Sequence, residues 1–216
     1  DIIELHNRPV MVSDFVKKIN SKIILYFHND PRTMKGAKTV SDRIILLNSV
    51  DKIIFISNWV KRKFFEGLPN FSENKTQVIY HSIDPVTKKT KKNKQIIFVG
   101  KLNESKGYDL FCKALFPILD KHTDWKAISI GDEKRFQHYN THKKHINLGQ
   151  ISHKKVLNFL SKSAIAVIPS RWEEPFGRTA LEATSMGCAT IISSNGGLTE
   201  TTDHAIILKK LNSKNL

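Results

Sequence analysis

The sequence has few cysteines and no long apolar run, and both absences narrow what the protein can be. Cys112 and Cys188 are the only two cysteines in 216 residues. They lack CxxC or Cys/His spacing, so they predict neither a zinc site nor a disulfide framework and fit a reducing setting. No stretch approaches the roughly 20 apolar residues that cross a bilayer. The opening DIIELHNRPV also lacks the features of a signal peptide, so we expect a soluble, cytoplasmic protein.

Acidic residues are scarce relative to basic ones. The chain has 35 Lys and Arg against 20 Asp and Glu, a formal net charge of +15. Such an excess favours an anionic partner such as a nucleotide, a lipid head group or a nucleic acid. Much of it is Lys beside abundant Ile and Asn, which a general compositional bias explains. Because no homeodomain, zinc-finger or RNP-type pattern appears, we predict no nucleic-acid partner.

Short Ile- and Val-rich runs alternate with amphipathic stretches, which is typical of α/β proteins built from βαβ units with parallel sheets. Six stretches predict helices, at residues 12–20, 42–50, 59–66, 108–121, 154–161 and 178–186. Nine runs predict strands, at residues 2–5, 22–27, 52–57, 76–80, 95–100, 125–131, 145–149, 164–170 and 188–193. Nine strands are too many for one small α/β sheet.

The polar, basic segment 84–94 separates two predicted strands and is interpreted as a linker or hinge. We therefore predict two domains, residues 1–83 and residues 95–216. The first supplies about four strands, so we expect it to be the latter portion of a nucleotide-binding-type domain. The second stops before an obvious closing helix, and we interpret the chain as a fragment.

Ligands of open α/β sheets bind beyond the carboxyl ends of the strands, so the residues after each run matter most. The segment KLNESKG, residues 101–107, carries Lys101 and Lys106 after one predicted strand. Gly100 and Gly107 would let the backbone approach a ligand, and two ammonium groups beside a helix N-terminus would hold a pyrophosphate. A solvated basic loop is the alternative, and the segment is not a Walker loop.

The segment SRWEEPFGRTALEA, residues 170–183, follows another predicted strand. Its EPFG turn should bend the chain so that the free amides of Gly177 and Arg178 begin a helix and face a ligand. Glu174 precedes that terminus, and Glu182 lies about one turn inside it. Because carboxylates accept hydrogen bonds from vicinal hydroxyls, we expect both acids to face one sugar or ribose. Helix-dipole charge for Glu174 and an exposed helix face for Glu182 are the alternatives.

Two further places after strands carry weaker signals. SNGGLTE, residues 194–200, has a glycine pair that suits close backbone contact with a ligand, although a plain turn explains it equally well. Glu200 is a further candidate there. His28 ends another strand, but a lone histidine is more often a structural hydrogen-bonding group than a catalyst.

These residues, in this order, resemble the retaining glycosyltransferases of family 4, a group with the GT-B fold. The resemblance runs through nearly the whole chain, in IELHNRP, LYFHNDP, IIFISNWVKRKF, VIYHSID, FVGKLNESKG, IPSRWEEPFGRTALEATSMGCATI and NGGLTE. Its most specific piece is the EX7E motif from Glu174 to Glu182, with the EPFG turn intact. The resemblance implies two Rossmann-like domains with parallel sheets that face a cleft, the first incomplete and the second holding most of a nucleotide-sugar donor.

The resemblance also implies which residues bind that sugar donor. Glu182 would bind the ribose, and Glu174 would hold sugar hydroxyls. Lys106 would bind the diphosphate together with Lys101, which stands where the family commonly has Arg and so replaces a bidentate clamp by a point charge. The implied contacts made through the backbone or beside the donor are those of Phe176, Gly177, Gly196 and Gly197.

Catalytic roles are implied for His28, Lys106 and Glu174. His28 matches a first-domain histidine that reaches the donor sugar across the cleft. Lys106 and helix amides would stabilise the charge that grows on the leaving diphosphate, without a metal or other cofactor, and UDP or GDP would be the product. Paired carboxylates also serve retaining hydrolases, which suggests Glu174 as a covalent nucleophile, but the resemblance places it on hydroxyls.

We therefore predict a retaining glycosyltransferase that moves a sugar from a nucleotide-sugar to a glycan, lipid-linked or small-molecule acceptor. Retention is implied by the resemblance alone. Peripheral association with the cytoplasmic membrane is compatible with this prediction. The alternatives are a nucleotide-sugar 2-epimerase of GT-B architecture, a non-catalytic sugar-nucleotide-binding module, and a binder of nucleic acid or anionic membrane that would explain the charge directly.

Overall fold

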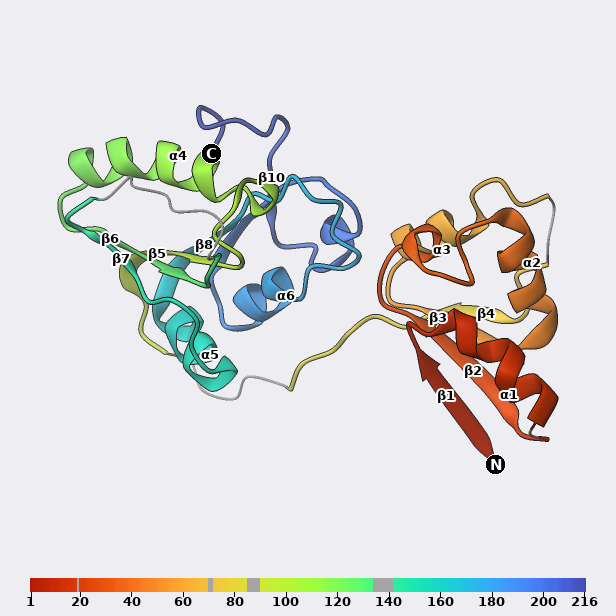
Figure 1. Ribbon diagram of the computed structural model, residues 1–216. Coiled ribbons are helices and arrows are strands. Elements are labelled where there is room, and N and C mark those ends of the chain that lie inside the picture. Colours follow the sequence, from red (N-terminus) through yellow and green to blue (C-terminus); the bar gives the residue numbers. More distant parts are fainter. Residues whose placement is uncertain (19, 70–71, 85–89, 134–141) are drawn as a thin grey trace. The chain divides into compact units, whose positions relative to one another are not determined.

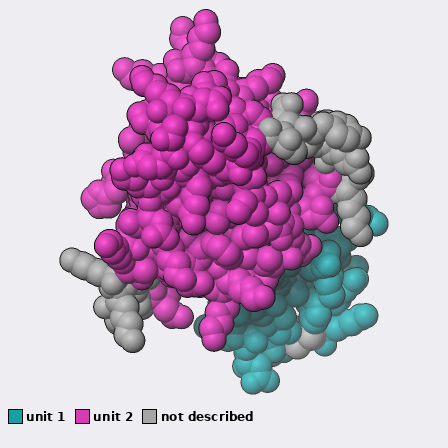
Figure 2. All heavy atoms as spheres, turned by 90° about the vertical axis from the view of Figure 1, so that its left-hand side faces the viewer, with its two compact units in different colours: residues 1–81 teal, residues 82–216 magenta. Residues whose placement is uncertain are grey.

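The chain folds into two compact units, residues 1–81 and 82–216. The computed structural model describes residues 1–18, 20–69, 72–84, 90–133 and 142–216. The ribbon is drawn in Figure 1, and Figure 2 colours the two units separately. The units divide two residues before the predicted boundary. Five residues of the predicted linker, 85–89, lie outside the described residues, and its last two belong to a strand.

The first unit is a parallel sheet of four strands in the order β1-β2-β3-β4. Its strands are β1 (Ile2–His6), β2 (Lys22–Phe27), β3 (Lys52–Phe55) and β4 (Thr76–Val78). Its helices are α1 (Val12–Lys18), α2 (Val40–Ser49) and α3 (Asn58–Phe65), with short 3-10 turns η1 (Pro9–Met11) and η2 (Pro31–Thr33).

A capping box in the sequence fixes the start of α2, and aromatic packing stabilises the core of this unit. Thr39 and Asp42 form a reciprocal capping box at the start of α2. Three rings from β2, β3 and α3 pack together with centroids 5.2 to 5.9 Å apart, those of Phe27, Phe55 and Phe64.

The second unit is a six-stranded parallel sheet in the order β10-β9-β8-β5-β6-β7. Its strands are β5 (Asn93–Val99), β6 (Lys126–Ile130), β7 (His145–Asn147), β8 (Ser163–Ile168), β9 (Ala189–Ile192) and β10 (Ile206–Ile207). Its helices are α4 (Tyr108–Lys121), α5 (His153–Lys162) and α6 (Arg178–Ser185), with the 3-10 turns η3 (Glu104–Lys106) and η4 (Leu198–Glu200). This is the strand order of the Rossmann fold, and it reverses between β5 and β8.

Helices cover both faces of the second sheet (Figure 1). Along β5 the side chains alternate, so that Ile96 and Phe98 pack with α4 while Ile97 packs in the cluster that includes α5 and α6. Burial on both faces explains why these strands are nearly continuous apolar runs.

The structure contains all nine predicted strands and all six predicted helices, with ends that differ by a few residues. The predicted α/β class with parallel, Rossmann-like sheets is therefore confirmed. Strand β10 was not predicted, because a two-residue strand carries too short a pattern. Within the described residues, none of the helices has the length and apolarity that a membrane span requires.

Candidate functional site

Two predicted site residues meet at the point where the strand order reverses. Lys106 ends η3, after β5, and Glu174 lies in the loop after β8. The Lys106 Nζ atom donates to Glu174 Oε1 over 2.6 Å, and the two side chains are 29% and 14% exposed. This edge of the sheet is where open α/β folds bind their ligands. The structure thus brings together one cation and one anion predicted for the same ligand.

The loop that carries Lys106 is fixed by a cap and by a glycine. The Asn103 side chain accepts from the backbone N–H of Lys106 over 3.1 Å. Gly107 follows with a φ of 73°, and a Cβ there would lie 1.9 Å from the carbonyl oxygen of Pro169. Gly107 lets η3 approach the end of β8, and the approach of this backbone to a ligand stays a prediction.

Backbone hydrogen bonds join the two loops directly. The carbonyl oxygen of Ser105 accepts from the backbone N–H groups of Arg171 and Trp172, over 2.8 and 2.9 Å. The Arg171 guanidinium is also bidentate to Asp109 at the start of α4, and it lowers the pKa of that carboxyl. Because both loops are held at several points, the Lys106–Glu174 pair has a rigid base.

Gly196 and Gly197, the glycine pair predicted beside the ligand, contact the main chain of Glu174. Gly196 bridges Glu174 as an isolated parallel pair, and the N–H of Gly197 donates to the Glu174 carbonyl oxygen over 2.6 Å. A Cβ on Gly196 would lie 2.3 Å from that oxygen. These glycines thus approach the protein backbone closely, and their contact with a sugar donor stays a prediction. The close approach fixes the main chain of Glu174.

The turn before α6 has the predicted form. Gly177 caps α6 with a φ of 92°, so the helix begins at Arg178, and Phe176 before it is buried. A Cβ on Gly177 would lie 2.2 Å from Cδ1 of Leu198. A larger residue at this position would thus disturb both the turn and η4.

Glu182 is buried, with 5% of its surface exposed, so the alternative of an exposed helix face is wrong. Its Oε1 atom accepts from the Arg178 Nε atom and from the His153 Nε2 atom, both at 2.9 Å. A buried carboxylate needs such partners to offset its lost hydration. The two acids of the EX7E spacing therefore have different partners here, since Glu174 is paired with Lys106.

Sequence reasoning missed His153, which opens α5, 29 residues before Glu182 in the chain. A histidine among surface lysines carries no signal of that contact. The other predicted basic residue, Lys101, is exposed just after β5.

His28 lies at the end of β2 in the first unit, and it is not the lone histidine that the sequence suggested. Its Nε2 atom is 2.9 Å from His6 Nδ1, and its Nδ1 atom is 3.3 Å from His81 Nε2. The Asn7 side chain accepts from its backbone N–H over 2.8 Å. Burial lowers the pKa of His28, and the neighbouring His6 and His81 lower it further.

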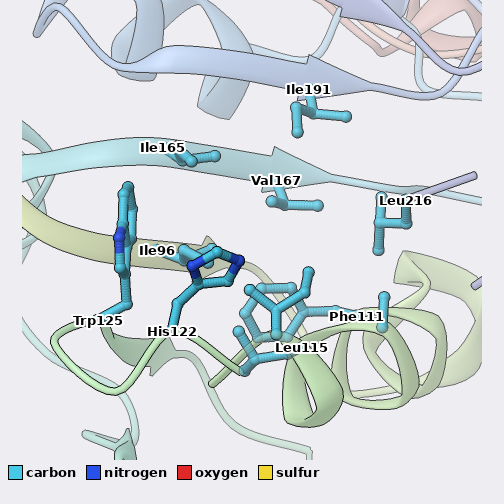
Figure 3. Close-up of a pocket in the computed structure, with 11 residues that line it drawn as sticks. Ile96, Phe111, Leu115, His122, Trp125, Ile165, Val167, Ile191 and Leu216 are labelled. Atoms are coloured by element: carbon cyan, nitrogen blue, oxygen red, sulfur yellow. The ribbon is translucent and has the colours of Figure 1, made fainter. Parts of the chain in front are cut away.

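A separate apolar pocket of about 250 Å³ lies between α4 and the second sheet (Figure 3). The residues that line it, labelled in Figure 3, include Phe111 and Leu115 from α4, Val167 from β8, and Leu216. No predicted site residue lines it, and its lining is almost entirely apolar. It does not suit a diphosphate. Within the described ranges, no group of three or more His, Cys, Asp or Glu is placed to hold a metal ion.

Known proteins resemble this chain in sequence and in fold. Residues 81–214 match the family model described as glycosyl transferases group 1. The 2-deoxystreptamine N-acetyl-D-glucosaminyltransferase of Niallia circulans is 29% identical over 198 residues, which cover 86% of this chain and 46% of that protein. The uncharacterized glycosyltransferase MJ1607 of Methanocaldococcus jannaschii is 31% identical over 178 residues, which cover 72% and 45%.

Solved structures show the same fold. A glycosyltransferase from Rickettsia africae superposes with a TM-score of 0.79 at 22% identity, covering 100% of this chain and 64% of that one. Anabaena HepE in complex with UDP superposes with a TM-score of 0.77 at 17% identity, covering 100% and 66%. The predicted GT-B type of fold is thus confirmed, and the chain spans about half the length of the curated relatives it matches. The family match covers more than half of the residues, so the chain belongs to the glycosyl transferases group 1.

Proposed function

We propose that the chain belongs to a retaining glycosyltransferase of family 4, which moves a sugar from a nucleotide-sugar to a glycan, lipid-linked or small-molecule acceptor without a bound metal. The observation that carries the proposal is the Lys106–Glu174 pair at the reversal of the strand order. A cation and a hydrogen-bonding carboxylate side by side suit a ligand that is anionic at one end and hydroxylated at the other.

Sugar-donor binding would rearrange this pair. The diphosphate would replace Glu174 as the ionic partner of the Lys106 ammonium. It would also accept hydrogen bonds from the backbone N–H groups at the start of α6, which Gly177 caps. Glu174, released from the lysine, would accept hydroxyls of the sugar. As the bond to the diphosphate breaks, Lys106 would stabilise the growing negative charge. One such group contributes on the order of 3 kcal/mol, a factor of about one hundred in rate.

Glu182 would bind the ribose. Its Oε1 atom is held by Arg178 and His153, which orient the carboxylate so that Oε2 can accept from a ribose hydroxyl. UDP is the first nucleotide to test, because HepE, of the same fold, was solved with UDP and with UDP-glucose. We also propose cytoplasmic action, with peripheral membrane association if the acceptor is lipid-linked.

A thermal-shift screen of nucleoside diphosphates and their sugars tests the proposed site, because a ligand of the folded state raises its melting temperature. We expect UDP or GDP to stabilise the wild type and to lose most of that effect in Lys106→Met. Lys121→Met is the matched control, because this exposed lysine is the last residue of α4, the helix whose first residue follows the site. Absence of any nucleotide effect would refute the site.

Product analysis then tests the reaction. A glycoside of the acceptor with retained anomeric configuration supports transfer. A free, isomerised sugar nucleotide would indicate a 2-epimerase, which none of the comparisons favours, and binding without turnover would indicate a non-catalytic module.

A further inference from the structure

In the first unit, a row of polar side chains includes His28, the histidine proposed to contact the sugar. It comprises Glu4, His6, His28 and His81, with Tyr26 packed along it. The Glu4 Oε2 atom lies 3.6 Å from His6 Nε2, and the two contacts between imidazoles measure 2.9 and 3.3 Å. We call these four residues the histidine row.

The sheet itself builds one end of this row. Glu4 and His6 are two residues apart on β1, so they share one face of the sheet. Parallel pairing places Tyr26 of β2 opposite His6, and the two rings stack with centroids 4.3 Å apart. The Tyr26 hydroxyl donates to Glu4 Oε1 over 3.3 Å, which turns the carboxylate toward the rings.

The backbone of His28 is held as firmly as its ring. Its N–H donates to the Asn7 side chain. Asn7 itself has a φ of 53°, in the left-handed region that Asn tolerates better than most residues. A residue held in this conformation persists only where its surroundings stabilise it. The main chain therefore places the His28 ring between its two neighbours.

Hydrogen-bond directions along the row follow from the carboxylate. Each contact between neutral imidazoles needs one N–H and one lone pair. The negative charge of Glu4, whose Oε2 atom lies 3.6 Å from His6 Nε2, too far for a hydrogen bond, favours the proton on that nitrogen, so that His6 Nδ1 accepts. His28 must then donate from Nε2, and its Nδ1 atom must accept from His81 Nε2. The reverse direction would turn the His6 Nε2 lone pair toward a carboxylate.

We propose that Glu4, His6 and His81 are positioning residues that hold His28 as the neutral Nε2–H tautomer in one ring orientation. The proposal rests on the proposed function only where it concerns transfer, since the row lies entirely within the first unit. A further proton on His6 Nδ1 or on His28 Nδ1 replaces an acceptor by a second donor and breaks one contact between imidazoles. Protonation of His6 or His28, which Glu4 and Tyr26 also face, therefore opens the row.

Nitrogen-15 NMR of histidine-labelled protein reads the tautomer directly. At pH 7.5 we expect the wild type to show His28 protonated at Nε2. His6→Asn places an acceptor near the Nδ1 position and His81→Gln a donor near the Nε2 position, so both should keep this tautomer. His6→Leu and His81→Leu should each give a mixture of tautomers. His81→Leu should also raise the pKa of His28, because it removes both a donor to Nδ1 and a neighbouring imidazole.

Two results would overturn the proposal: His28 protonated at Nδ1 in the wild type, or a tautomer that both leucine variants leave unchanged. Amide spectra of each variant show whether it is folded. Should a leucine variant unfold, the wild type and the Asn and Gln variants still decide, because a neutral His28 protonated at Nδ1 in any of them at pH 7.5 contradicts the row.

The kinetics of sugar transfer, measured as kcat/KM against pH, test the positioning role separately. We expect His6→Asn and His81→Gln to stay within about threefold of the wild-type kcat/KM, and the leucine variants to fall roughly tenfold to a hundredfold with a displaced acidic limb. A merely structural role would lower the rate without moving that limb. The NMR result needs no sugar donor, so it survives failure of the proposed reaction. Conversely, nucleotide binding by the second unit is unaffected if the row fails.

Discussion

Replacing Glu174 by Gln should have opposite effects on nucleotide binding and on transfer. The Lys106 ammonium is paired with Glu174, and both side chains are partly exposed, by 29% and 14%. A diphosphate must compete for that ammonium, so removing the carboxylate charge should help it. The same carboxylate is proposed to hold the sugar hydroxyls, so its loss should slow the reaction.

The magnitude follows from the exposure of the pair. Partly exposed ion pairs contribute up to about 1 kcal/mol, which corresponds to roughly fivefold in affinity. We therefore expect Glu174→Gln to bind UDP or GDP about five times more tightly than wild type. A charged hydrogen bond to a sugar hydroxyl contributes about 1.5 to 3 kcal/mol, so kcat/KM should fall roughly tenfold to a hundredfold.

Titration calorimetry with the diphosphate measures the first effect, and initial rates measure the second. Asp203→Asn removes the same charge from an exposed site and should leave both within about twofold. In a Lys106→Met background the gain from Glu174→Gln should shrink by about 1 kcal/mol, the coupling energy of the pair. Weaker diphosphate binding by Glu174→Gln would refute the reasoning.

Three further predictions concern the second unit. Gly107→Ala should lower the free energy of unfolding in urea by about 2 kcal/mol, because its Cβ would lie 1.9 Å from the Pro169 oxygen at a φ of 73°; a loss under about 0.5 kcal/mol would contradict this. Burial lowers the pKa of His145 to about 4, so the unfolded chain binds its proton first. Stability should fall by roughly 2 to 3 kcal/mol as the pH drops from 6.5 to 4, and an unchanged pH dependence in His145→Gln would exclude this cause. Burial also raises the pKa of Cys112 to about 11 and raises that of Cys188, so a thiol reagent should label both only after unfolding, and rapid labelling of folded protein would be inconsistent with their burial.

The sequence by itself determined the elements and the local turns. Alternating apolar runs and amphipathic stretches located nine strands and six helices, because burial against a sheet or a helix imposes a period that neighbouring residues display. Gly177 at the start of α6 was predictable for the same reason: a bend and a helix cap depend on residues adjacent in the chain.

Only the tertiary structure decided which side chains meet. Lys106 and Glu174 are 68 positions apart, and Glu182 takes His153 from another helix. His28, apparently isolated in the sequence, lies between histidines 22 and 53 positions away. These partners follow from the order of the strands and the packing of α5. The sequence shows which residues are charged, but the strand order decides which of those residues lie next to each other at the ends of the strands.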